Sequence, residues 1–164
     1  MMRIVVADTG PLRYLAQIDQ IELLPRLFEK IFIPSIVSDE LRHPSAPEAV
    51  RKWIGSKPSW LDISMVSSSD DPSLGALDQG ERSAIALGLA LSADLLLIDD
   101  RRGAASARTK GFEVIGTLGV LDLAARRDIV DLSEAVARLR TTNFRRREEL
   151  FDALLKQHRA RTGG

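Results

Sequence analysis

Cysteine is absent from this chain of 164 residues, and only two histidines are present. Without cysteine there is no disulfide, no thiolate zinc site, no iron–sulfur cluster and no cysteine nucleophile. The two histidines, His43 and His158, are too far apart in sequence to form a ligand pair of the usual spacing. A lack of cysteine is typical of a reducing compartment, so we expect a cytoplasmic protein.

Long hydrophobic runs are also missing. The longest uncharged apolar stretch, residues 83–93, is far shorter than the roughly 20 residues of a membrane span. The first residues, MMRIVVADTG, reach Asp8 without the hydrophobic region of a signal peptide. We therefore expect no contact with a membrane.

The composition is that of one folded domain. Hydrophobic residues make up 45% of the chain and charged residues 28%, which excludes a mostly disordered protein. The net charge of zero is unevenly spread, because residues 1–137 carry five more acidic than basic residues and residues 138–161 the reverse. We predict a domain over residues 1–140 and a basic helical extension of the same domain over 141–164. Such an extension suggests contact with nucleic acid, although a solvated basic helix face explains it equally well.

Short aliphatic strands alternate with helices along the chain. Strands are predicted at Arg3–Ala7, Ile31–Ile33, Trp60–Val66, Leu95–Ile98 and Phe112–Ile115. This alternation predicts an α/β fold, a three-layer α/β/α sandwich with a mostly parallel central sheet. The strands that begin near Arg3 and Leu95 are purely aliphatic, and we place them in the centre of the sheet.

The helices differ in the strength of their signals. Residues 78–91 predict a helix that begins with the capping-box spacing Asp78-x-x-Glu81. Because it is apolar almost all round, we expect it to be a central helix that is buried on all sides. Before it, Ser67–Ser73 predicts a flexible loop. From Thr117 onward the pattern is helical to the end, with a break near Thr141–Asn143.

Acidic residues follow the strands at the places where a parallel sheet gathers its functional groups. Asp8 follows the first strand, and Asp99 and Asp100 follow the most apolar one. Because parallel strands end at the same edge, we expect these carboxylates to lie close together although about 90 residues separate them. Glu40 and Glu81 lie on helices expected to border that edge.

Each acid also has a purely structural explanation. Asp8 and the pair Asp99–Asp100 could cap the helices that follow them. Glu40, next to Asp39, could be an exposed helical residue, and Asp78 with Glu81 could form a reciprocal capping box. The functional interpretation depends on the shared position of these acids in the fold.

Clustered carboxylates repel one another unless a cation offsets their charge. Oxygen ligands without cysteine select Mg²⁺ or Mn²⁺ over zinc or copper. Such ions activate water for in-line displacement at a phosphodiester, so the pattern indicates metal-assisted hydrolysis at phosphorus.

Five segments together resemble a known family. VADTGPL at residues 6–12 and IPSIVSDEL at 33–41 resemble the opening of a PIN domain. LDQGERSAIAL at 77–87, LLIDDRRG at 96–103 and GFEVIGTLGVL at 111–121 resemble its DUF3368-type branch, related to VapC-type toxins. The resemblance covers roughly residues 3–140 and implies a PIN-like fold.

The resemblance also implies a function. PIN domains are Mg²⁺- or Mn²⁺-dependent ribonucleases, and many are toxins neutralised by a small antitoxin protein. Asp8 and Glu40 match the first two acids of the family, and Glu81 matches the third, with Asp78 as second choice. The fourth falls on Asp99 or Asp100, and Thr9 matches the hydroxyl residue that hydrogen-bonds beside the metal. Glutamate stands where many PIN domains have aspartate, and the strand end is Leu-Ile-Asp-Asp in place of Thr-x-Asp.

Partners follow from the same residues. The substrate is expected to be RNA, with its phosphates held by Arg101, Arg102, Arg145, Arg146 and Arg147. Apolar residues in the helices of 12–28 and 47–54 suggest a homodimer or an antitoxin surface. Two other functions compete: a catalytically silent PIN-like module that binds RNA or protein, and a receiver-like phosphoacceptor domain. A receiver-like domain requires a pair of acids after its first strand, where this sequence has only Asp8.

Overall fold

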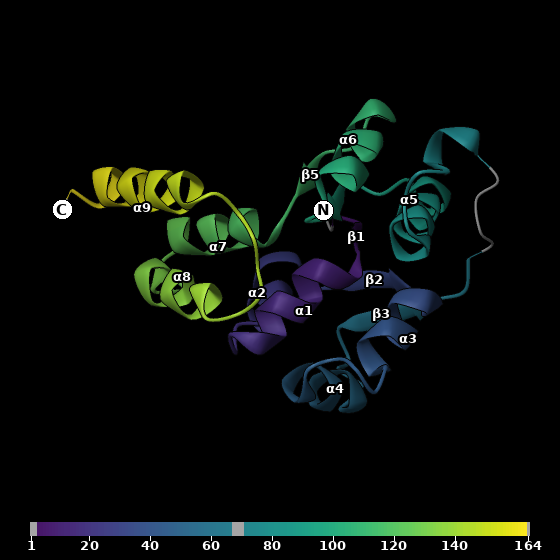
Figure 1. Cartoon of the computed structure of the whole chain (residues 1–164), viewed down its shortest axis with the longest axis horizontal. Coiled ribbons are helices and arrows are strands. Elements are labelled where there is room, and N and C mark those ends of the chain that lie inside the picture. The colour runs from purple at the N-terminus through teal and green to yellow at the C-terminus, as the bar shows by residue number, and fades with distance from the viewer. Residues whose placement is uncertain (1–2, 67–70, 164) are drawn as a thin grey trace.

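Five parallel strands form one sheet at the centre of the chain (Figure 1). The structure is a computed structural model that describes residues 3–66 and 71–163. The strand order is β3-β2-β1-β4-β5, and every pairing is parallel. The strands are β1 (Val5–Ala7), β2 (Ile31–Pro34), β3 (Leu61–Ser64), β4 (Leu95–Leu97) and β5 (Val114–Ile115). The five strands and the α/β class are as predicted, and β1 and β4 pair with each other inside the sheet.

The aliphatic character of β1 and β4 follows from helices on both sides. Side chains alternate along a strand, so Val5 and Ala7 enter the core on one face and Val6 the core on the other. Leu95 and Leu97 alternate with Leu96 in the same way. A strand buried on both faces has no position for a polar side chain.

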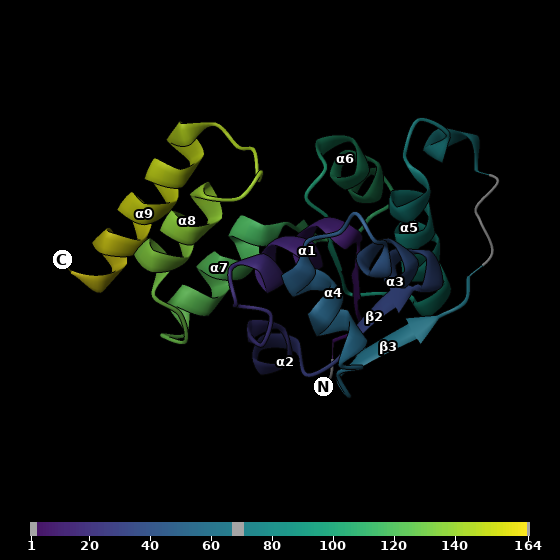
Figure 2. The same cartoon turned by 60° about the horizontal axis from the view of Figure 1, so that its bottom comes forward.

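Two groups of helices cover the two faces (Figure 2). The smaller group consists of α5 (Gln79–Leu91) and α6 (Arg101–Thr109). The larger consists of α1 (Thr9–Gln17), α2 (Leu23–Phe28), α3 (Ser35–Arg42), α4 (Glu48–Gly55), α7 (Thr117–Arg126), α8 (Leu132–Arg140) and α9 (Glu148–Thr162). No helix within residues 3–66 and 71–163 has the length and apolarity needed to cross a membrane.

Helix α5 begins as predicted but is buried on one side only. The Asp78 carboxylate caps it by accepting a hydrogen bond from the Glu81 backbone N–H at 2.8 Å. Leu89 is 49% exposed, because only the side that faces the sheet is covered, so the expectation of burial all round was wrong. Most of the loop predicted before it, residues 67–70, lies outside the described residues, and Pro72–Leu74 forms a short 3-10 helix.

The apolar residues from which self-association was predicted belong to the core of this chain. Leu12, Leu15, Leu24 and Ile54 are completely buried, and Trp53 packs against the same core. The completely buried residues cannot serve an interface, so the homodimer stays a prediction without their support. Among the described residues, the large hydrophobic side chains that are exposed are Ile63, Met65, Leu89 and Leu150.

The C-terminal segment contains three helices where the sequence predicted one break. The predicted break near residue 141 separates α8 from α9. A second break after α7 was not foreseen; there Asp128 takes a left-handed φ of 57°, and Asp131 caps α8. Phe144 and Phe151 are buried in the larger core, so the basic segment packs onto the domain. The boundary at residue 141 stays a prediction.

Candidate functional site

Asp8 lies at the carboxyl edge of the central strand. It follows β1 directly, and its backbone N–H donates a hydrogen bond to the Leu97 carbonyl of β4 at 2.9 Å. The residue is 7% exposed. Its backbone occupies the capping position of α1, but its side chain makes no capping hydrogen bond to that helix. Capping therefore does not explain why an acid is buried here.

The electrostatic state of Asp8 reflects its surroundings. Burial raises the pKa of its carboxyl to about 7, against a lowering by the Thr9 backbone N–H, and the carboxylates of Asp78, Glu40 and Asp99 raise it further. These three neighbours are acids predicted for the site. The edge of the sheet therefore holds negative charge without an adequate counter-charge.

Glu40 reaches Asp8 from α3. The Thr9 hydroxyl donates a hydrogen bond to Glu40 Oε2, so Thr9 lies beside the second acid as expected. A Cβ atom at Gly80 would lie 2.9 Å from Glu40 Oε1 and 3.2 Å from Asp8 Oδ1. The two carboxylates thus border one small space, which the glycine in the first turn of α5 leaves open. Burial, followed by repulsion from Asp78, raises the pKa of Glu40 against the effect of Thr9.

Glu81 is the buried acid of α5. The capping interpretation holds for Asp78, whose carboxylate accepts from the Glu81 backbone. The Glu81 side chain is shielded instead, and burial together with the carboxylates of Asp78, Asp100 and Asp8 raises its pKa to about 8. A Cβ at Gly103 would lie 3.4 Å from Glu81 Cγ, so α6 closes over this acid.

The structure separates the two candidates for the fourth acid. Asp100 caps α6 by accepting from the Gly103 backbone N–H at 2.9 Å. Asp99 accepts from the backbone N–H and the hydroxyl of Thr117, both at 2.7 Å. Asp99 influences Asp8, whereas Asp100 influences Glu81, because consecutive residues after β4 face different neighbours.

Thr117 was not foreseen from the sequence. It is fully buried and opens α7 at the end of the neighbouring strand β5, and both of its donors hold Asp99. Burial raises the pKa of Asp99, while Thr117 and then Arg146 lower it. The sequence did contain one signal for this residue, because Thr117 is a hydroxyl residue that directly follows a predicted strand and a glycine.

Gly116 gives a direct test of this arrangement. A Cβ there would lie 2.5 Å from Asp99 Oδ1, so Gly116→Ala must displace the Asp99 carboxylate. We expect the free energy of unfolding of this variant to fall by about 1–3 kcal/mol, as it does on overpacking. If the acids hold a metal ion as the sequence predicts, metal-dependent RNA cleavage should fall at least tenfold. Urea unfolding and an RNA cleavage assay measure the two effects. Gly55→Ala is the control, because a Cβ at Gly55 meets nothing within 4 Å; equal behaviour of the two variants would contradict the arrangement.

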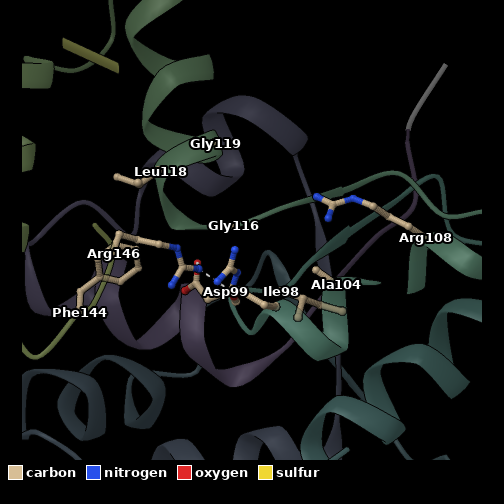
Figure 3. Close-up of a pocket in the computed structure, with 10 residues that line it drawn as sticks. Ile98, Asp99, Ala104, Arg108, Gly116, Leu118, Gly119, Phe144 and Arg146 are labelled. Atoms are coloured by element: carbon tan, nitrogen blue, oxygen red, sulfur yellow. Dashed lines mark hydrogen bonds and ion pairs between the residues drawn. The ribbon is translucent and has the colours of Figure 1, made fainter. Parts of the chain in front are cut away.

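Basic side chains lie next to the acids. Arg101, Arg108 and Arg146 line a cavity of about 290 Å³ together with Asp99 and Gly116 (Figure 3). Arg101 and Arg145–Arg147 line a second cavity of about 390 Å³, with Leu150. Arg102 is exposed and lines neither of them, and Arg108 was not predicted.

The acids suit a hard divalent cation in their chemistry. All donors are carboxylate or hydroxyl oxygens, and the raised pKa values of Asp8 and Glu81 mark charge that a cation would offset. Within residues 3–66 and 71–163, no three acidic or histidine side chains form a ready-made set of ligands. Glu40, which accepts the hydrogen bond of Thr9, already borders the space beside Asp8, so two carboxylates face that space.

A parallel sheet with acids at its carboxyl edge agrees with the PIN-like fold that the sequence motifs predicted. The model of the DUF3368 family, described as a PIN domain, matches residues 4–160. The chain therefore belongs to the DUF3368 family of PIN domains, and PIN domains are generally nucleases.

A solved structure supports the fold. The chain is similar to a PilT N-terminus domain protein from the hyperthermophilic archaeon Sulfolobus solfataricus P2, with a TM-score of 0.54 and 19% identity. The match covers 74% of this chain and 92% of the archaeal chain. No curated protein matches the chain in sequence.

Proposed function

We propose that the protein is a Mg²⁺- or Mn²⁺-dependent endoribonuclease that hydrolyses RNA phosphodiester bonds. The observation that carries the proposal is the group of carboxylates around Asp8, of which Asp99 lines a cavity that arginines also line. Membership of a family of nucleases supports the same reaction class. A cation next to a phosphate site is what hydrolysis at phosphorus requires.

Each acid has a distinct role in this proposal. Asp8, Glu40 and Asp99 would hold the metal ion, which would supply Lewis-acid polarisation of the scissile phosphate and a more acidic water molecule. Asp8 and Asp99 follow rigid strands, and Thr117 fixes the orientation of Asp99. Thr9 orients Glu40, and Glu81, beside Asp100, positions the attacking water or accepts its proton.

The direct test is incubation of the purified full-length chain with single-stranded and structured RNA. We expect cleavage with Mg²⁺ or Mn²⁺ and none with EDTA. Cleavage that persists in EDTA would contradict the metal-dependent mechanism. An unchanged RNA in both conditions would contradict the assignment as a nuclease.

Two observations favour a second function, that of a silent module which binds RNA without cleaving it. The Asp99 carboxylate already accepts two hydrogen bonds from Thr117, and the described acids form no ready-made trio of ligands. Such a protein would retain RNA in a filter-binding assay with and without EDTA and leave it intact.

The arginines outside the ion pair with Asp99 are proposed to hold the RNA backbone. Arg145→Gln and Arg147→Gln are each expected to weaken RNA binding and to reduce the slope of log K against log salt by about 0.7, the effect of one phosphate contact on a single strand. Fluorescence anisotropy between 50 and 200 mM salt measures both. Arg3→Gln, at the opposite edge of the sheet and paired with Glu113, is the control. An unchanged slope in both test variants would exclude them as phosphate contacts.

We further propose a toxin role with a small antitoxin protein as partner. The motifs at 77–87 and 96–103, which resemble the DUF3368-type branch related to VapC-type toxins, support it. Induced expression of the wild type in a bacterial host should arrest growth, and Asp8→Asn should not. Light scattering of the purified wild-type protein tests whether it forms the predicted homodimer.

A further inference from the structure

Arg146 differs from the other arginines of the C-terminal segment. Its side chain is 26% exposed and contributes to both arginine cavities. The guanidinium Nη2 donates a hydrogen bond to the Asp99 carbonyl at 2.5 Å and lies 3.8 Å from Asp99 Oδ1. Arg145 and Arg147 are exposed, and among the described residues neither forms an ion pair with an acid.

The segment that carries Arg146 is anchored to the domain at several points. Tyr14 of α1 donates a hydrogen bond to Asn143 Oδ1 at 3.0 Å. Phe144 is buried and packs edge-on against Tyr14 and Phe151, with ring centroids 5.0 and 6.1 Å away. The Arg146 guanidinium lies 5.0 Å from the Phe144 ring centroid, in a cation–π contact that directs it toward Asp99 (Figure 3).

Arg146 contributes charge to Asp99 more than orientation. Both carboxylate oxygens of Asp99 are already fixed by the two donors of Thr117, which belong to a different element, α7. The guanidinium adds a full positive charge that stays near this carboxylate, because Phe144 and the Asp99 carbonyl hold it there. A fixed positive charge close to a cation site opposes binding of a second cation.

We propose that Arg146 is a positioning residue that acts through Asp99 as a tethered counter-charge, and that it weakens divalent-metal binding in the RNA-free protein. The inference rests on the proposed function, because it concerns the same metal site. It assigns Arg146 a role different from that of Arg145 and Arg147, although the three are consecutive and chemically identical.

The test is calorimetric titration of the metal-stripped full-length protein with MnCl₂ at low salt. Arg146→Gln removes the charge and keeps a donor for the Asp99 carbonyl, and we expect it to bind Mn²⁺ about threefold to tenfold more tightly than the wild type. Arg146→Met, which keeps an extended side chain on Phe144, should give the same increase. Arg146→Lys, which keeps the charge, and Arg3→Gln, which removes a remote charge, should stay within about twofold of the wild type.

A role limited to folding cannot raise metal affinity, so equal or weaker Mn²⁺ binding by both neutral variants would overturn the proposal. If the wild type binds Mn²⁺ and cleaves RNA while the neutral variants bind unchanged, the inference fails and the proposed function stands. If only the neutral variants bind, the inference is supported. If neither they nor the wild type bind, both the inference and the metal-dependent function fail.

The contact itself is tested without metal by a double-mutant cycle of Arg146→Gln and Asp99→Asn in urea unfolding. We expect Arg146→Gln to cost less stability in the Asp99→Asn background than in the wild type. Additive effects would show that Arg146 does not act through Asp99 and would overturn the proposal.

Discussion

Asp8→Asn is expected to abolish metal-dependent RNA cleavage, by a hundredfold or more, and to make the metal-free protein more stable. The asparagine removes one charge from a site where burial and three neighbouring carboxylates oppose that charge. We expect a gain on the order of 1–2 kcal/mol in unfolding free energy, or about 3–6 °C in Tm for a chain of this length. Cleavage assays and thermal unfolding in EDTA measure the two effects.

The matched control for this variant is Asp19→Asn. Asp19 is exposed and has a left-handed φ of 60°, which asparagine also tolerates. The control should retain wild-type cleavage and stability. Wild-type cleavage by Asp8→Asn would remove Asp8 from the site, and a large loss of stability would show that its negative charge serves the fold.

The second large effect is a loss of stability of the metal-free protein as the pH rises. The folded-state pKa values of Asp8, about 7, and Glu81, about 8, lie above the ordinary values of 3.8 and 4.5. A raised pKa gives stability that is fully present below the ordinary value and is lost as the pH rises through the folded value. Urea unfolding in EDTA should therefore show a decrease on the order of 2 kcal/mol between about pH 4 and pH 8.

Two comparisons make this prediction specific. Mn²⁺ should restore stability near pH 8, because the ion binds the ionised carboxylates, and Asp8→Asn should flatten the profile. At lower pH the stability changes in the opposite direction. Lys110 and Ser73 lower the pKa of Asp71 to about 2, so the stability that the ionised Asp71 contributes is lost as the pH falls from about 4 to 2. A metal-free stability that rises between pH 5 and 8 would contradict the placement of the acids.

The fold could be predicted largely because the central strands β1 and β4 are aliphatic without interruption. The aliphatic run Leu95–Leu97 is typical of a strand in the interior of a parallel sheet. Acids that follow such strands lie together at one edge of the sheet. Local patterns also located the helices, including the cap at Asp78. Periodicity alone could not reveal that α5 leaves Leu89 exposed, because that depends on what packs against the helix.

The details of the site depend on contacts between distant segments, which a single sequence does not encode locally. Thr117 and Arg146 both reach Asp99, from 18 and 47 residues away. The sequence likewise could not show which of Asp99 and Asp100 contacts Thr117 and which caps α6. Apolar residues such as Leu12 and Trp53 were interpreted as an interaction surface, because the sequence does not show which core residues they contact.

The pairing of β1 with β4 also determines when the site can exist. Val6 lies beside Leu96, so the innermost strand acquires that neighbour only after some ninety further residues have been made. Asp8 is the first acid of the site to emerge from the ribosome, and Thr117 and Arg146 emerge much later. A nascent chain therefore carries its earliest acid without the groups that complete its surroundings. Synthesis itself delays assembly of the acidic edge of the sheet until residues 117 and 146 are available to fold.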